Sequence, residues 1–361
     1  MNKGSTRTRV LIGLAAVAMI ATACSSTGAS GAPSAGASGA AGNITVGISN
    51  PGAVGNGWRE AMICSAKAQA VKSGNISSVL ATTRVTDAAG QLADIRDLIA
   101  KNVNILLINP WSPDALNPAI AEAIAKGIAV VAIDAPVTAP GAYNLSNDQV
   151  EYAYLGAKAL FEQMGKTGDV IYMRGIAGHQ ADTDRDTGFK KALAEYPDIK
   201  VAKETVTKWD QKIAVDQIND ILTSGLKFDG IWTSGIDNVI VDALKTAKHP
   251  LVPIVGADNA GFVKQLINEA GLKGAAVTNP AAVGGAGVVL GLQILDKKAP
   301  ADPNVHVTPE LWDNTTEEGK AALAAANDET LPAIWPLGLT VKDWTTYDKE
   351  AVKACKGPGE S

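Results

Sequence analysis

Short, uninterrupted apolar runs alternate with helical segments through most of this chain. The clearest run, residues 128–133, reads IAVVAI and stops abruptly at Asp134, which is followed by Ala135 and Pro136. A strand that is apolar at every position is typical of a parallel sheet with both faces covered. Strands that alternate with helices predict crossover connections, and hence an α/β fold with helices on both faces of each sheet.

The alternation occurs in two successive sets, which predicts two lobes. The length of 361 residues is sufficient for about two domains. In the first set, the strands are expected at residues 44–49, 77–83, 105–108 and 128–133. In the second set, they are expected at residues 169–173, 199–206, 230–232, 252–255 and 274–278.

The positions of these sets predict the domain boundaries. We expect lobe one to comprise residues 43–147 and 280–310. We expect lobe two to comprise residues 148–279 and 311–361, the latter including a C-terminal extension. Within this extension, residues 339–341 are expected to form a last strand.

The first 42 residues indicate export and membrane attachment. Three basic residues precede an apolar stretch that is too short to span a bilayer, which is the pattern of a secretory signal over residues 1–23. Cys24 follows small residues, as in a bacterial lipobox, and residues 24–42 have the composition of a flexible tether. Ala21 stands where a lipobox usually has leucine, so a plain signal peptidase site is the alternative. We expect Cys24 to be lipidated and the protein to work on the outer face of a membrane.

Two further cysteines, Cys64 and Cys355, remain if Cys24 carries a lipid. In an oxidising compartment we expect them to form a disulfide, which would tie the C-terminal tail to the first helix. Two reduced thiols, one of them buried, are the alternative. No cysteine pair has metal-site spacing and no Cys/His cluster occurs in the sequence, so we expect neither a metal nor a cofactor.

Several function classes find no support in the sequence. The formal net charge is −5 and no basic patch runs through the chain, which argues against a nucleic-acid partner. No Walker loop, nucleophile elbow or HExxH motif occurs in the sequence, and the histidines His179, His249 and His306 are scattered. We therefore predict no catalytic residues and no enzymatic activity, and we expect His179 to be solvated.

Polar and aromatic side chains gather after the predicted strands, where open α/β sheets bind their ligands. Structural roles are the alternatives: Asp134 would cap a turn, Trp58 would pack on the sheet, Arg185 would form an ion pair and Asp258 would cap a helix. Tryptophan suits the apolar C–H face of a sugar or polyol, while carboxylates, amides and guanidinium groups bond its hydroxyls. The pattern favours a neutral polyhydroxyl ligand. The candidate binding residues are Asn56, Trp58, Arg59, Trp111, Asp134, Arg185, Trp209, Asp237, Asp258 and Asn279.

The core of the chain resembles the ribose-binding-protein-like, sugar-binding family of type I periplasmic binding proteins. The stretches that carry the resemblance are residues 105–110 (ILLINP), 128–134, 175–178 with RDTGF at 185–189, and 254–258. The resemblance implies two Rossmann-like lobes that are joined by a three-strand hinge and close over one sugar. It implies an ABC importer permease as the partner. It also implies a hinge-side polar residue in the pocket at Asn147.

Two departures from the family pattern, at Ala135 and at Gly235 with Asp237, predict a wider and differently wired pocket, and Arg59 is a further difference. Ala135 replaces the arginine that follows the strand-four carboxylate in ribose-binding proteins. Gly235 replaces the asparagine of the usual Asn-Asp pair in lobe two, with Asp237 shifted. Arg59 stands where a second aromatic residue is usual. These changes argue against ribose itself, and the larger C-terminal region is similar to the autoinducer-2 and rhamnose branch of the family.

The sequence as a whole predicts a monomeric, lipid-anchored solute-binding protein that delivers a monosaccharide or polyol to an ABC importer. The alternative is a sugar or autoinducer-2-like furanose sensor that feeds a membrane receptor. The effector lobe of a transcriptional regulator is disfavoured by the secretion signal and by the lack of a helix-turn-helix segment before residue 43. A hydrolase is disfavoured because no nucleophile–base pair is visible in the sequence.

Overall fold

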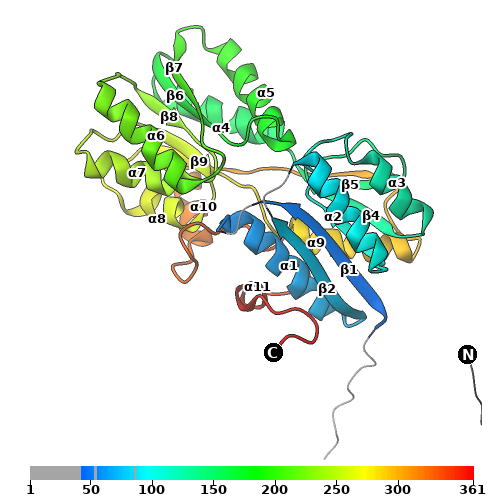
Figure 1. Cartoon of the computed structure of the whole chain (residues 1–361). Helices are drawn as coiled ribbons and strands as arrows, with labels where there is room; N and C mark the ends of the chain where they lie inside the picture. Colours follow the sequence, from blue (N-terminus) through cyan, green and yellow to red (C-terminus); the bar gives the residue numbers. More distant parts are fainter. Residues whose placement is uncertain (1–41, 53–54, 85–86) are drawn as a thin grey trace, which may run out of the picture. The chain divides into compact units, whose positions relative to one another are not determined.

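The computed structural model describes residues 42–52, 55–84 and 87–361 (Figure 1). The expected signal peptide, the expected lipidation site Cys24 and all but the last residue of the expected tether lie outside these residues. Within the described residues, no helix combines the length and the apolar character that crossing a bilayer requires.

Lobe one contains a six-stranded parallel sheet with the strand order β11-β5-β4-β3-β1-β2. Helices α1 and α9 pack together on it, and α2 and α3 pack together as a second pair. The strands are β1 (Ile44–Pro51), β2 (Ile76–Arg84), β3 (Ile105–Ile108), β4 (Ala129–Asp134), β5 (Tyr143–Asn147) and β11 (Asn304–Val307). The helices are α1 (Gly57–Ser73), α2 (Ala88–Ala100), α3 (Asn117–Ala125) and α9 (Val283–Leu295).

The central strands of this sheet are buried on both faces. In β3, Leu107 belongs to the cluster that contains the side chains of α1 and α9, whereas Leu106 belongs to the cluster with those of α2 and α3. Val131 and Val130 of β4 divide in the same way. Because successive side chains of a strand point to opposite faces, a strand between two helical layers has to be apolar at every position. This arrangement explains the uninterrupted apolar runs in the sequence.

Lobe two contains a second six-stranded sheet with the order β12-β10-β9-β8-β6-β7, in which only β12 is antiparallel. Its strands are β6 (Gly168–Arg174), β7 (Ile199–Val206), β8 (Gly230–Trp232), β9 (Ile254–Ala257), β10 (Gly274–Val277) and β12 (Leu311–Asp313). Its helices are α4 (Gln149–Gln163), α5 (Gln180–Glu195), α6 (Gln211–Ser224), α7 (Asp237–Thr246), α8 (Ala260–Asn268) and α10 (Glu317–Ala326). The predicted two-lobe α/β fold is confirmed.

The chain passes between the two sheets in three short segments. These segments follow β5, β10 and β11, and lead to α4, α9 and β12 respectively. They correspond to the expected three-strand hinge. A fourth connection, residues 327–348, leads from α10, which packs on β12 and α8 of lobe two, to α11 (Lys349–Ala354), which packs on α1 of lobe one (Figure 1). We call residues 327–348 the strap.

The C-terminal region departs from two expectations. The sequence predicts residues 311–361 in lobe two, but α11 packs on α1 of lobe one. Residues 339–341 do not form a strand, because the strap turns there and the amide of Leu339 donates to the carbonyl of Leu337 at 2.8 Å. A backbone that turns back on itself in this way leaves no extended edge to pair with a sheet.

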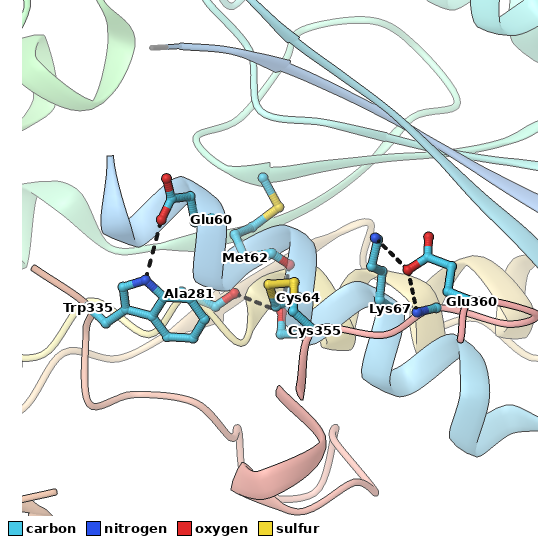
Figure 2. The surroundings of a disulfide bond; sticks show 10 residues. Glu60, Met62, Cys64, Lys67, Ala281, Trp335, Cys355 and Glu360 are labelled. Carbon is cyan, nitrogen blue, oxygen red and sulfur yellow. Dashed lines mark hydrogen bonds and ion pairs between the residues drawn. A yellow bond between two sulfur atoms is a disulfide. The ribbon is translucent and has the colours of Figure 1, made fainter. Parts of the chain in front are cut away.

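A disulfide joins Cys64 of α1 to Cys355 directly after α11 (Figure 2). The two Cα atoms are 4.5 Å apart, and the residues are separated by 291 positions in the sequence. This is the pairing that the sequence predicts. The ion pair between Lys67 and Glu360, with 2.8 Å between Nζ and Oε2, lies on the same helix and tail. The C-terminal tail is thus fixed to the first helix of lobe one.

Candidate functional site

A pocket lies where the carboxyl ends of strands from both lobes meet, and it is the candidate binding site. Its walls come from the start of α1, the end of β4, the first turns of α5 and α6, the end of β9 and the hinge segment after β10. Eight of the eleven residues that the sequence predicts line it. They are Asn56, Trp58, Arg59, Asp134, Arg185, Trp209, Asp258 and Asn279.

The first turn of α1 places three of these residues. The side chain of Asn56 caps the helix by accepting a hydrogen bond from the amide of Arg59 at 3.1 Å. The indole Nε1 of Trp58 donates to the backbone carbonyl of Asn279 at 2.6 Å. The tryptophan is therefore held between the first helix and the hinge, where it lines the pocket and also packs against the hydrophobic core.

Arg59 is a buried cation at the lobe interface. Its Nη1 donates to Oδ1 of Asn50 at 2.7 Å, and its Nη2 lies 3.3 Å from Nε2 of His179 in lobe two. Burial lowers the pKa of Arg59 to about 10, against an opposing effect of the Asp134 charge. The guanidinium group therefore still carries its charge at neutral pH.

Asp134 ends β4 in a left-handed backbone conformation, with φ at 72°. For a residue other than glycine this conformation costs about 1–3 kcal/mol, and it is found mainly where function requires it. Its Oδ1 accepts hydrogen bonds from Gln149 at 2.8 Å and from Asn147 at 3.4 Å. Burial raises the pKa of Asp134, while the charges of Arg185 and Arg59 act in the opposite direction. The backbone turn directs this carboxylate into the pocket.

Arg185 comes from α5, and its guanidinium group lies over two aromatic rings. It is 4.2 Å from the ring centre of Tyr152 and 5.7 Å from that of Trp209. Its Nε donates to Oε1 of Gln149 at 2.7 Å. With the amide oxygen of Asn279 turned toward it, Nη2 donates to that oxygen at 3.2 Å. These contacts exclude the predicted alternative, in which Arg185 pairs with an acid of its own helix.

Trp209 is presented by a strained turn before α6. Lys208 and Trp209 both have left-handed backbones, with φ at 57° and 52°. Its indole lies against Gly175, where an added Cβ would be only 2.1 Å from Cε2 of the tryptophan. Its Nε1 donates to the hydroxyl of Ser234 at 3.3 Å. The glycine makes room for the ring, and the turn directs the ring toward the pocket.

Asp258 follows β9 and is completely buried. Its two oxygens accept hydrogen bonds from the amides of Asn279 and Gly338, both at 3.1 Å. Burial raises its pKa to about 6, from an ordinary value of 3.8. The alternative role as a helix cap falls to Asn259, whose side chain accepts from the amide of Phe262 at 3.0 Å.

Three predicted residues lie outside the pocket. Asp237 is fully buried, because the turn after β8 folds its carboxylate back onto the neighbouring loop. The carboxylate accepts hydrogen bonds from the Thr233 hydroxyl, the Gly235 amide and the Asn259 side chain. Trp111 lines an adjoining groove that shares Arg59 and Trp209 with the pocket. Asn147 lies buried beside Asp134.

The expectation that His179 is solvated is wrong. It is fully buried and caps α5, with its Nδ1 accepting from the amide of Ala181 at 3.2 Å. Its ring meets Trp111 and Trp209 edge to face, at 5.7 and 5.2 Å between ring centres. Burial and the charges of Arg59 and Arg185 lower its pKa well below the usual 6.5. His179 therefore packs as a neutral residue between the lobes.

Two kinds of residue at the site were not predicted from the sequence. Gln149 joins Asp134 of lobe one to Arg185 of lobe two, and its position at the start of a helix just after the expected hinge was the available signal. Ile334 and Pro336 of the strap line the pocket, but they follow no strand and form no motif. A search for polar and aromatic residues directly after the predicted strands therefore could not identify Ile334 and Pro336.

The chemistry of the lining is electrically balanced. Two arginines and two aspartates line the pocket together with two tryptophans and two asparagines that the sequence predicted. Among the residues that the structure describes, no group of three or more His, Cys, Asp or Glu side chains could hold a metal ion. The arrangement can bind an uncharged molecule that has an apolar face and several hydroxyl groups.

Comparisons with known proteins match the two-lobe fold. Residues 46–299 match the family model described as periplasmic binding protein domain. The chain is 30% identical over 176 residues to a xylitol-binding protein of Mycolicibacterium smegmatis, which covers 48% of this chain and 50% of that relative. It is 26% identical over 227 residues to a ribose import binding protein of Haemophilus influenzae, covering 61% and 77% respectively. The chain thus spans about half the length of the xylitol-binding relative.

Solved structures share the fold over most of the chain. An ABC transporter solute binding protein from Thermobispora bispora superposes with a TM-score of 0.71 at 27% identity, covering 87% of this chain and 97% of that one. A solute binding protein from Mycobacterium smegmatis with bound glycerol gives a TM-score of 0.69 at 23% identity, covering 80% and 98%. The second likeness shows the fold alone.

Proposed function

Since the chain belongs to the periplasmic binding protein domain family, we propose that it is an extracytoplasmic solute-binding lipoprotein that captures one monosaccharide or polyol and delivers it to an ABC importer. The observation that carries this proposal is the pocket, in which two tryptophans meet a balanced set of two arginines and two aspartates. The names of the relatives, which include xylitol-binding and ribose import binding proteins, support the same ligand class.

Each group in the pocket has a defined part in this proposal. The indole faces of Trp58 and Trp209 take the apolar C–H faces of the ligand. Asp134 and Asp258 accept hydrogen bonds from ligand hydroxyls, and Arg185 donates them. Hydrogen bonds to charged groups contribute roughly 1.5–3 kcal/mol each, and micromolar affinity requires about 8 kcal/mol in total. A handful of such contacts is therefore sufficient.

A neutral ligand also fits the electrostatics of the pocket better than an anion. A carboxylate or phosphate on the ligand would face the carboxylates of Asp134 and Asp258, and the two arginines of the lining offset only the charges of these two aspartates. A ligand that contacts both lobes binds the closed state more tightly and shifts the equilibrium toward it. The closed form is the species we expect to dock on the permease.

A thermal-shift screen of the full chain against pentoses, hexoses, polyols and furanose sugars tests the proposal, followed by titration calorimetry on the best compounds. We expect micromolar or tighter binding of one uncharged member at a stoichiometry of one. D-Ribose 5-phosphate and D-gluconate serve as charged controls and should bind much more weakly. Binding of an amino acid or nucleotide in preference to every sugar and polyol would contradict the proposal.

The membrane anchor is a separate part of the proposal and has its own test. We propose that Cys24 is lipidated after removal of residues 1–23, as the lipobox-like segment indicates. Metabolic labelling with an alkyne fatty acid in the native host, compared with Cys24→Ser, measures this directly. Equal labelling of the two proteins, or release of the wild-type protein into the medium, would show that the segment is a plain signal peptide.

A further inference from the structure

The strap is built into the binding pocket, although it lies outside the region that matches the family model, which ends at residue 299. Ile334 and Pro336 line the pocket, and the amide of Gly338 donates to the pocket carboxylate of Asp258 at 3.1 Å. We propose that the strap is the wall that sets the size of the ligand, and that the Cys64–Cys355 disulfide holds this wall against lobe one. The proposal deepens the proposed function and rests on it.

The centre of the strap is bound to lobe two at the junction of β9 and α8. The amides of Ala260 and Gly261 donate to the carbonyls of Trp335 and Ala333, each at 2.9 Å. The amide of Leu337 donates to the carbonyl of Asp258 at 2.9 Å. The bonds of Ala260 and Leu337 flank a single antiparallel bridge between Asn259 and Pro336, so the side chains of the strap have defined positions relative to the pocket floor.

The same segment also touches the first helix of lobe one. An added Cβ on Gly57 would lie 2.2 Å from the carbonyl oxygen of Ile334, so the helix start and the strap are in direct contact. The indole Nε1 of Trp335 donates to Oε2 of Glu60 at 3.4 Å (Figure 2). Ile334 therefore lies beside the turn that presents Asn56 and Trp58 to the pocket.

The far end of the strap is fastened to lobe one in several ways. The side chain of Gln69 in α1 bonds to Thr346 twice, donating to its hydroxyl and accepting from its amide, both at 3.0 Å. The disulfide follows nine residues later at Cys355. Figure 2 shows the disulfide and the Glu60–Trp335 contact on the same helix. The strap is thus held at one end by lobe one and at its centre by lobe two.

These contacts give Ile334 and Pro336 a role in selection. Both are apolar and contribute no hydrogen-bonding side chain, so they can reject extra ligand atoms but cannot bond hydroxyls. A single extra methylene in an apolar pocket changes affinity by roughly 10-fold or more. A ligand one carbon longer on this side would have to displace a wall that both a disulfide and backbone hydrogen bonds hold in place.

The test compares ligands that differ by one hydroxymethylene group. We measure dissociation constants of the full chain for D-ribose and D-allose, and for xylitol and sorbitol, and take the ratio within each pair. We expect Ile334→Ala to shift the ratio for the pair that binds roughly tenfold toward the larger member. Thr340→Ala, an exposed strap residue outside the pocket, is the matched control and should leave the ratio unchanged. The Cys64→Ala/Cys355→Ala variant should shift the ratio in the same direction as Ile334→Ala.

The outcomes separate this inference from the function on which it rests. If the wild type binds one of these compounds and Ile334→Ala leaves the ratio unchanged, the strap does not select for size and the inference is overturned. If the wild type binds a different compound of the wider screen, the ratio is taken for that compound and its homologue with one more hydroxymethylene group, and the same outcomes apply. If it binds no compound at all, the proposed function fails and the inference fails with it. Should Ile334→Ala melt far below the wild type, Ile334→Val provides a smaller opening, and an unchanged ratio in that folded variant is equally decisive.

Discussion

The guanidinium group of Arg59 in lobe one lies 3.3 Å from Nε2 of His179 in lobe two. Because Nδ1 of His179 accepts from the amide of Ala181, a neutral imidazole carries its proton on Nε2. This N–H faces the guanidinium group of Arg59, which can only donate hydrogen bonds. A protonated imidazole would add a second positive charge beside the first. This pair of residues therefore places a pH-sensitive contact at the lobe interface.

The first prediction concerns stability in mild acid. Because the pKa of His179 is depressed in the folded protein, its contribution to stability is present above the unfolded pKa of about 6.5 and is lost as the pH falls toward the folded pKa. Each pH unit in this window costs up to about 1.4 kcal/mol. Melting temperatures between pH 7.5 and 5 should fall more steeply for the wild type than for His179→Gln. The exposed His306 provides the control, and a His306→Gln profile that is as flat as that of His179→Gln would refute the assignment.

Asp258 should show the opposite dependence on pH. Its pKa is raised to about 6 by burial, so its contribution to stability is fully present below the ordinary value of 3.8 and is lost as the pH rises through about 6. Relative to Asp258→Asn, the wild type should therefore gain stability as the pH is lowered from 7 to 4. Melting curves of both proteins across this range measure the difference. A constant offset between them would mean that the carboxyl is already ionised at acid pH.

Gln149 is expected to couple the two lobes during binding. Its amide donates to Asp134 and accepts from Arg185, so Gln149→Ala leaves a carboxylate and a guanidinium group that are both buried and each short of one partner. An unsatisfied buried group costs about 1–3 kcal/mol, and we expect a loss of binding free energy of similar size. Titration calorimetry with the best ligand of the screen measures it. Gln217→Ala, a glutamine of α6 outside the pocket, should bind as the wild type does.

Removal of an aromatic platform should affect binding rather than folding. Trp58 is half-buried at the pocket wall, and Trp58→Ala is expected to weaken binding by about 2 kcal/mol through lost apolar contact. Trp312→Ala on β12 removes a similar half-buried indole away from the pocket and should leave the dissociation constant unchanged. Equal affinity of Trp58→Ala and the wild type would remove Trp58 from the binding site.

Asp237 should behave as a structural residue. Its carboxylate satisfies Thr233, Gly235 and Asn259, and an added Cβ on Gly256 would lie 1.9 Å from its Oδ1. We expect Asp237→Ala to destabilise the protein by about 1–3 kcal/mol because it leaves these buried donors without an acceptor. The dissociation constant of the folded variant should change little. A large loss of affinity at unchanged melting temperature would return Asp237 to the list of ligand contacts.

The parts of the fold that could be predicted are the strands that are buried on both faces, because burial requires an apolar residue at every position. β4 lies between two helical layers, so its apolar run and its abrupt end at Asp134 were both visible. β5, by contrast, is the polar sequence YNLSN, and its side chains Asn144 and Ser146 bond to residues on the neighbouring β11. A strand stabilised by such polar pairing lacks the periodic signal and was missed.

The same reasoning explains what was found at the site. Trp209 and Arg185 follow strands of lobe two, so the rule that ligands bind at strand ends located them. That rule also selected Asp237, because it cannot tell a side chain that turns outward from one that folds back onto its own loop. Ile334 reaches the pocket through long-range hydrogen bonds between the strap and α8, which no local pattern encodes.

Both ends of the described chain lie on lobe one. The described chain begins at β1 of lobe one, and the disulfide returns its last residues to α1 of that lobe. An attachment upstream of residue 43 would therefore be connected directly to lobe one. Lobe two is therefore inserted between segments of lobe one, and the strap adds a fourth link between the two lobes beside the three hinge segments.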